Sequence, residues 1–361
     1  MSTRALSKAV RRAAALTAVA ALGLTGGLAE AAPLEDGGTV VTVGAEQPVA
    51  LIAPDGGTAY VVVLDAARGI RVKAVDTRTG AVGGQVGLGT AEGRPRSALA
   101  ADGTRLYVLN GADLSVVDTA TLTVLSTTAA PDQPRPAGWV AGAPSGIAVS
   151  PDGATVYVAQ DGPWQYKRRR DARLLAFSTA ERAFTASVPL GAWLTGTPAI
   201  RPGTGDLYLG TSAGLLHLDA SGGAPVVLRT VPDTVASTGY DLAFTPDGRR
   251  LLALDGGLSG RGDLVDPAAD AVVRRITLTA PDTVVGLPRS ASDGSRFYAV
   301  EDDPDQPLLH AYDTTTGEDV ADETLPSPER KVTGLAVGPD GDALYLSGTT
   351  GDTARLHILP N

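Results

Sequence analysis

Residues 145–159 read SGIAVSPDGATVYVA, in which two stretches of alternating apolar residues flank the turn sequence Ser150-Pro151-Asp152-Gly153. Proline fixes φ at the second turn position, aspartate can accept a hydrogen bond from its own backbone, and glycine tolerates the positive φ that ends the turn. The segment therefore predicts an antiparallel β-hairpin.

This hairpin pattern returns seven times, with an aspartate or glycine five residues before a tyrosine or leucine. The copies are Asp55/Tyr60, Asp102/Tyr107, Asp152/Tyr157, Gly203/Tyr208, Asp247/Leu252, Asp293/Tyr298 and Asp340/Tyr345, at intervals of 44 to 51 residues. A period near 45 residues with four short β-type segments is the length of one propeller blade. We therefore predict an all-β fold, a seven-bladed β-propeller of four-stranded antiparallel blades.

A second aspartate recurs in step with the blades, at the end of the third predicted strand. It is followed by threonine or a small residue at Asp76, Asp118, Asp219, Asp266 and Asp313. Because these aspartates repeat with the blades, we interpret them as turn-forming residues between the third and fourth strands rather than as catalytic acids.

The two ends of the chain indicate how the ring closes. Thr39 to Gly44, TVVTVG, is a β-type segment with no blade before it, whereas the last repeat stops at Asn361 after three strands. Pairing Val40 to Val43 with the last repeat would complete that blade and remove the open sheet edges. We predict that the N-terminal strand completes the last blade.

The first 31 residues have the pattern of a secretory signal peptide. Basic residues without an acid are followed by the apolar segment 13–24 and by the small-x-small sequence Ala29-Glu30-Ala31. We predict that residues 1–31 are a cleaved signal peptide rather than a membrane span, and that residues 32–361 form one propeller domain. The expected location is secreted, extracellular or associated with the cell wall.

Charge and composition exclude several classes of function. The net charge is −10, and it becomes −13 when the four basic residues and one glutamate of residues 1–31 are removed. So acidic a chain repels nucleic acid and anionic lipid. The chain has no cysteine, and it lacks the nucleophile-elbow, phosphate-loop, zinc-protease and dinucleotide motifs. We expect a monomer without a cofactor.

Several repeats resemble YVTN-type propeller repeats of secreted and surface-layer bacterial proteins. The similar segments are SPDGATVYVAQ at 150–160, AADGTRLYVLN at 100–110, GPDGDALYLSG at 338–348 and SVVDTATLTV at 115–124. Similar blades occur in seven-bladed lactonases and quinoprotein-like propellers. The tryptophan-aspartate ending of WD40 blades is absent. The resemblance implies the propeller fold, and it implies little about activity.

One predicted loop combines aromatic and basic residues. The connection between the second and third strands of blade 3 contains Trp164, Tyr166, Lys167, Arg168, Arg169 and Arg170. Irregular loops on a rigid scaffold often bind partners, and aromatic rings with guanidinium groups suit an anionic one. We predict partner binding here, to a protein or a cell-envelope glycan. A solvated charged loop is the alternative.

Polar residues near the starts of the first strands are expected at the mouth of the central channel. The candidate ligand-binding residues are Arg94, Arg96, Tyr240, Asp241, Arg289 and Lys331, with Gln47 and Ser145 near them. Their positive charge favours an anionic ligand. As an alternative, these residues only solvate a water-filled tunnel. A lactonase-type hydrolase is the rival function, with Asp241 as base beside Arg96 and Arg289.

The histidines give no sign of a metal centre. His217, His310 and His357 lie in the third strands of three different blades. We expect His310 and His357 to face solvent between the blades. The acidic residues Glu301, Asp302, Asp303 and Asp305 are interpreted as a solvated loop rather than a calcium site. With no metal site and no catalytic motif, the favoured function is a non-enzymatic binding module. A structural role in the envelope is a further alternative.

Overall fold

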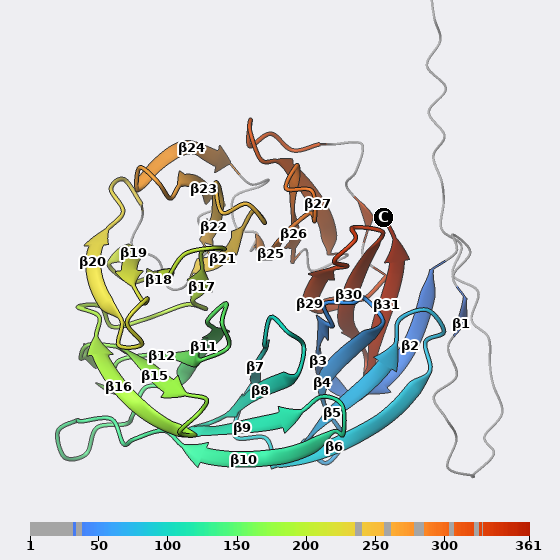
Figure 1. The fold of residues 1–361 in the computed structure, drawn as a ribbon, viewed down its shortest axis with the longest axis horizontal. Coiled ribbons are helices and arrows are strands. Elements are labelled where there is room, and N and C mark those ends of the chain that lie inside the picture. The colour runs from blue at the N-terminus through green and yellow to red at the C-terminus, as the bar shows by residue number, and fades with distance from the viewer. Residues whose placement is uncertain are drawn as a thin grey trace, which may run out of the picture.

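The computed structural model describes residues 32–33, 38–234, 240–255, 261–277, 285–302, 307–320, 325–326 and 328–361. Within these residues the chain forms β-strands and no helix, and seven antiparallel sheets surround a central axis (Figure 1). The predicted seven-bladed β-propeller is confirmed. The predicted signal peptide, residues 1–31, lies outside the described residues.

Each blade is a hairpin followed by a second hairpin, and in sequence order its strands are named a to d. Blade 1 contains β3 (Glu46–Ile52), β4 (Thr58–Leu64), β5 (Gly69–Asp76) and β6 (Val82–Thr90); blade 2 contains β7 (Arg96–Leu99), β8 (Arg105–Asn110), β9 (Asp113–Asp118) and β10 (Thr123–Ala129). Blade 3 contains β11 (Pro144–Val149), β12 (Thr155–Gln160), β15 (Arg173–Ser178) and β16 (Ala183–Pro189). Between β12 and β15, β13 (Trp164–Gln165) and β14 (Arg168–Arg169) form a small separate hairpin.

The remaining blades repeat this order. Blade 4 contains β17 (Ala199–Ile200), β18 (Asp206–Thr211), β19 (Gly214–Asp219) and β20 (Val226–Thr230); blade 5 contains β21 (Tyr240–Phe244), β22 (Leu251–Asp255), β23 (Arg261–Asp266) and β24 (Ala271–Thr277). Blade 6 contains β25 (Val285–Ser290), β26 (Arg296–Glu301), β27 (Leu308–Asp313) and β28 (Leu325–Pro326). Blade 7 contains β29 (Lys331–Val337), β30 (Ala343–Thr350) and β31 (Thr353–Pro360), completed by β2 (Thr39–Gly44) with β1 (Ala32–Pro33) beside it.

The N-terminal strand closes the ring as predicted. β2 pairs antiparallel with β31, with Val40 opposite His357 and Val41 opposite Leu356. Val41 and Val43 are fully buried, in a cluster that also includes residues of blades 7 and 1. β1 adds a fifth strand to this sheet, which differs from the predicted four.

The repeated aspartates form turns, as the sequence predicted. In the a–b hairpins, Asp102 Oδ1 accepts a hydrogen bond of 2.9 Å from Thr104 N, and Asp152 accepts one of 3.0 Å from Ala154 N. In the c–d hairpins, Asp118 Oδ1 accepts a 2.9 Å bond from Thr121 N. Gly153 has φ of 70°, the left-handed conformation that its turn requires.

Apolar packing in the described residues is divided into seven clusters, and each lies between neighbouring blades. The repeated tyrosines belong to these layers and connect successive blades. Tyr157 of blade 3 donates to the carbonyl of Ala220 in the c–d turn of blade 4, and Tyr208 of blade 4 reaches Pro267 in the same turn of blade 5. Each blade therefore depends on the next for its core, so closure of the ring completes the last layer.

Candidate functional site

A small cavity of about 160 Å³ lies on the axis of the ring and receives residues from all seven blades. Seven of its lining residues occupy the same place in the repeat, six positions before the a–b turn residue: Val49, Arg96, Gly146, Thr197, Asp241, Leu287 and Gly334. At Gly146 an added Cβ would lie 2.4 Å from Thr197 Cα, so glycine permits the close approach of neighbouring a strands. The axial cavity is thus built by the repeat itself.

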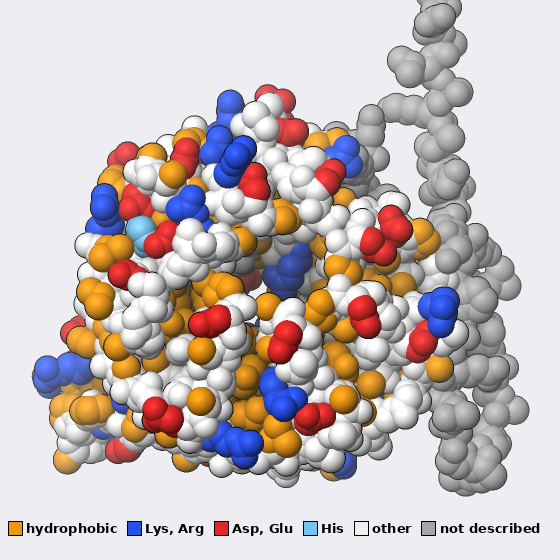
Figure 2. Space-filling model, viewed as in Figure 1, with side chains coloured by type: hydrophobic (Ala, Val, Ile, Leu, Met, Phe, Trp, Pro, Cys, Tyr) orange, Lys and Arg blue, Asp and Glu red, His pale blue; other side chains and the backbone are white. Residues whose placement is uncertain are grey.

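Charged residues in the axial cavity are mostly basic. Arg94, Arg96 and Arg289 line it together with a single carboxylate, Asp241. Basic side chains are visible inside the central hollow in Figure 2. Burial lowers the pKa of Arg96 and of Arg289, while the charge of Asp241 acts in the opposite direction on both. The cavity therefore concentrates positive charge in an otherwise acidic protein.

The hydrogen bonds of these arginines leave donors unused. Arg94 Nη2 donates to Thr333 O at 2.9 Å, and Arg289 Nη1 donates to Pro288 O at 2.7 Å. Arg96 Nε is buried, and no described residue accepts a hydrogen bond from it. A guanidinium group has five N–H donors, so the cavity has hydrogen-bonding capacity that the protein does not satisfy.

The structure brings together four of the six residues predicted at the channel mouth: Arg94, Arg96, Asp241 and Arg289. Lys331 is exposed at the start of β29 and does not line the axial cavity, and neither do Gln47 and Ser145. The side chain of Tyr240 lies outside the described part of the structure. The position six residues before each a–b turn residue was a usable sequence signal. It would have added Val49, Thr197 and Leu287 to the predicted residues of the channel mouth.

The second candidate site is the hairpin β13–β14 with the loops that hold it. The d–a loop before β11 pairs with this hairpin through hydrogen bonds of 2.9 Å in both directions between Val140 and Trp164. The d–a loop before β17 is joined to it by a 2.9 Å bond from Gly162 N to Trp193 O. The predicted irregular loop is therefore an ordered hairpin anchored on both sides.

All three tryptophans of the chain gather around this hairpin. The guanidinium carbon of Arg169 lies 5.2 Å from the centre of the Trp164 ring and 5.6 Å from that of Trp193, and Arg170 lies 5.6 Å from Trp139. These are cation–π distances. Tyr166 is 86% exposed at the turn of the hairpin, with φ of 54°. We call Trp139, Trp164, Tyr166, Lys167, Arg168, Arg169, Arg170 and Trp193 the tryptophan–arginine surface.

Trp139 and Trp193 were not predicted as site residues, because they lie about 25 to 29 positions from Trp164 in the flanking d–a loops. The occurrence of all three tryptophans in the loops around one blade was the sequence signal that could have identified Trp139 and Trp193. Asp161, next to the hairpin, is influenced by the charges of both Arg96 and Arg169, and burial raises its pKa despite hydrogen bonds from Thr195. Charges of the axial cavity and of the tryptophan–arginine surface therefore both act on Asp161.

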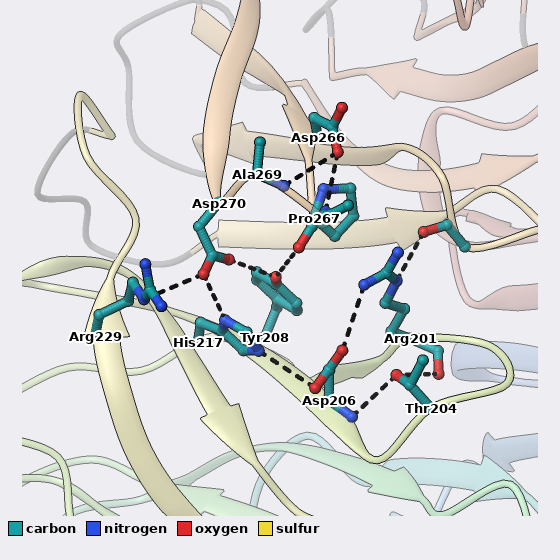
Figure 3. Close-up of polar contacts among 12 residues, drawn as sticks. Arg201, Thr204, Asp206, Tyr208, His217, Arg229, Asp266, Pro267, Ala269 and Asp270 are labelled. Carbon is teal, nitrogen blue, oxygen red and sulfur yellow. Dashed lines mark hydrogen bonds and ion pairs between the residues drawn. The ribbon is translucent and has the colours of Figure 1, made fainter.

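The prediction that His310 and His357 face solvent was wrong. His217, His310 and His357 are buried, and each contacts carboxylates. His217 Nδ1 lies 2.9 Å from Asp270 of the neighbouring blade, with Tyr208 stacked on its ring (Figure 3). A carboxylate that accepts a hydrogen bond from a buried imidazole makes its burial possible. These partners lie 9 to 53 residues away in the sequence.

The acidic loop also differs from its prediction in part. Glu301 is the last residue of β26 and is buried, with Oε2 2.7 Å from His310 Nε2. His310 Nδ1 contacts Asp319 at 2.9 Å. Asp303 and Asp305 lie outside the described residues. In the described part of the chain, no group of three or more histidines, cysteines or acidic residues is placed to hold a metal ion, and no helix has the length and apolarity needed to cross a membrane.

Comparison with known proteins supports the fold and leaves the family open. No protein-family model and no curated protein matches the chain. Among solved structures, hydrazine synthase of Kuenenia stuttgartiensis is similar, with a TM-score of 0.67 over 89% of this chain and 97% of that one. Only 19% of the aligned residues are identical. This likeness shows the fold alone.

Proposed function

We propose that this protein is an exported binding module that attaches to an acidic glycan of the cell envelope through the tryptophan–arginine surface. The observation that supports it best is the stacking of Arg169 on Trp164 and Trp193 in an anchored hairpin. The propeller fold is consistent with a binding or interaction module. Export rests on the signal-peptide pattern of residues 1–31, and a place among secreted YVTN-type proteins rests on the resemblance of the repeats.

The chemistry of this surface fits a chain of charged sugars. Indole and phenol rings offer flat apolar faces to the C–H faces of sugar rings. Guanidinium groups form paired hydrogen bonds with carboxylates and phosphates. Because Arg169 and Arg170 are already oriented by tryptophans, little side-chain entropy would be lost on binding. Lys167 to Arg170 also form a local positive patch on a protein of net charge −10.

The test is binding of the purified protein to polygalacturonate, with a neutral glycan of similar length as control. We expect saturable binding that weakens as salt increases. Replacing Lys167, Arg168, Arg169 and Arg170 by glutamine should weaken it at least tenfold, and Tyr166→Ala should weaken it further. Arg78→Gln with Arg249→Gln, on the turn face, removes exposed charge elsewhere as a matched control. Equal binding by the hairpin variants would refute the proposal, and binding only to an acidic protein would point to a protein partner.

The lactonase-type alternative has one observation in its favour, since Asp241, Arg96 and Arg289 line the same cavity. However, Asp241 Oδ2 already accepts a hydrogen bond of 3.1 Å from the backbone N–H of Leu287. Because this hydrogen bond engages the carboxylate of Asp241 with the backbone, Asp241 is a weaker candidate for a general base. Binding is therefore the preferred function.

A further inference from the structure

The position of Arg289 breaks an otherwise regular pattern in the channel wall. The a-strand residue opposite the repeated tyrosine, or opposite Leu252 in blade 5, is alanine in five blades and leucine in one: Leu51, Ala98, Ala148, Ala199, Ala243 and Ala336. In blade 6 this residue is Arg289, opposite Tyr298. Packing between blades does not require a charge here, because the other six blades manage without one.

The backbone of blade 6 is distorted next to Arg289. Leu287 and Pro288 lie opposite the single residue Ala299, which is a β-bulge, and Leu287 has φ of 57°. A branched apolar residue in the left-handed region costs about 1–2 kcal/mol. Such strain is concentrated at sites where a protein must present a particular group. The bulge and its hydrogen bond from Leu287 to Asp241 fix the strand that carries Arg289.

From these features we infer that the axial cavity binds one short dicarboxylate, held by Arg94, Arg96 and Arg289. Three guanidinium groups and one carboxylate leave a charge of +2, which a dicarboxylate neutralises. The free Arg96 Nε supplies a donor that has no protein acceptor among the described residues. Carboxylates form bidentate hydrogen bonds with arginine.

The size and lining of the axial cavity narrow the ligand class. Its volume is about 160 Å³, which suits a small anion better than a sugar polymer. Val49, Ile147, Leu242 and Leu287 line it beside the arginines. An apolar wall suits the hydrocarbon body of a short dicarboxylate and offers nothing to inorganic phosphate, which has similar charge.

Titration calorimetry on the purified protein tests this inference with succinate, acetate and phosphate at matched ionic strength. We expect succinate to bind at one site per chain, more tightly than acetate or phosphate. Arg289→Ala gives blade 6 the residue of five other blades and should fold normally, yet weaken succinate binding at least tenfold. Arg96→Gln should do the same, whereas the exposed turn variant Arg249→Ala should bind as the wild type does.

Three results would overturn the inference: no saturable succinate binding by the wild type, equal affinity in Arg289→Ala, or tighter binding of phosphate than of succinate. Far-UV circular dichroism checks that each variant is folded. The axial cavity and the tryptophan–arginine surface use different residues, so the hairpin variants should bind succinate normally. Failure of this inference is therefore distinct from failure of the proposed glycan binding.

Discussion

Asp241 Oδ2 of blade 5 accepts a hydrogen bond of 3.1 Å from the backbone N–H of Leu287 in blade 6. Leu287 is the residue of the bulge that has positive φ, at 57°. One side chain thus stabilises a strained backbone in the adjacent blade. It does so at the axis, where both residues line the same cavity.

This relationship separates a structural from a catalytic role for Asp241. Asp241→Ala should lower the free energy of unfolding by about 1–2 kcal/mol, because the amide of Leu287 loses its acceptor. Asp241→Asn keeps an oxygen acceptor and should be nearly as stable as the wild type. Thermal unfolding of the three proteins measures this. If Asp241→Asn were stable but abolished a lactone hydrolysis present in the wild type, that result would support the hydrolase alternative.

The cluster around Asp270 should be a major stabilising contact between blades 4 and 5 (Figure 3). Asp270 is buried and contacts Tyr208 at 2.6 Å, His217 at 2.9 Å and Arg229 at 3.2 Å. Asp270→Ala removes one acceptor from each of these groups, so we expect the free energy of unfolding, measured in urea, to fall by about 3 kcal/mol. The exposed Asp113→Ala should change stability by less than about 0.5 kcal/mol. Similar losses in both variants would mean that the cluster contributes nothing specific.

Acid should destabilise the fold through its turns. Backbone N–H groups hold the pKa of Asp76 and of Asp118 below the ordinary value of 3.8, with threonine hydroxyls as the next contribution. The same direction holds for Asp313. When a carboxyl group has a lower pKa in the folded state than in the unfolded state, it contributes stability. That contribution is complete above the pKa of the unfolded state, and it is lost as the pH falls through the pKa of the folded state. The free energy of unfolding, measured with urea, should therefore fall steadily below about pH 4.

The pH dependence can be assigned by mutation. Asp118→Asn keeps a side-chain oxygen for Thr121 N but cannot titrate, so its stability should depend less steeply on pH than that of the wild type. Stability that is constant between pH 5 and pH 2.5 in the wild type would contradict the assignment.

Closure of the ring by β2 should decide whether the protein is soluble as a monomer. Val41→Ala removes buried methyl groups between blades 7 and 1 and should cost about 1–3 kcal/mol. Removing all residues through Gly44 uncovers the edge of β31 and should produce oligomers or aggregates. Size-exclusion chromatography with light scattering distinguishes the forms. A truncated chain that stayed monomeric and equally stable would show that closure is dispensable.

The sequence was most informative where the structure is periodic. Seven copies of one hairpin predicted seven blades, and the unpaired segment Thr39–Gly44 predicted closure, because local turn chemistry and strand alternation are encoded within a few residues. The turn role of aspartates such as Asp152 and Asp118 was predicted for the same reason. Arg94, Arg96, Asp241 and Arg289 were also predicted near one another, since repeat register alone places the starts of the a strands around the axis.

Only the tertiary structure revealed the contacts between residues that are distant in the sequence. The histidines are buried because carboxylates such as Asp270 and Glu329 reach them from positions 53 and 28 residues away. Trp139 and Trp193 join Trp164 because two d–a loops fold against one hairpin. The bulge at Leu287, with Asp241 as its partner, also has no local sequence pattern. The periodic sequence determines the repeated backbone of the blades. Which side chains meet across neighbouring blades is decided only when the blades pack against one another.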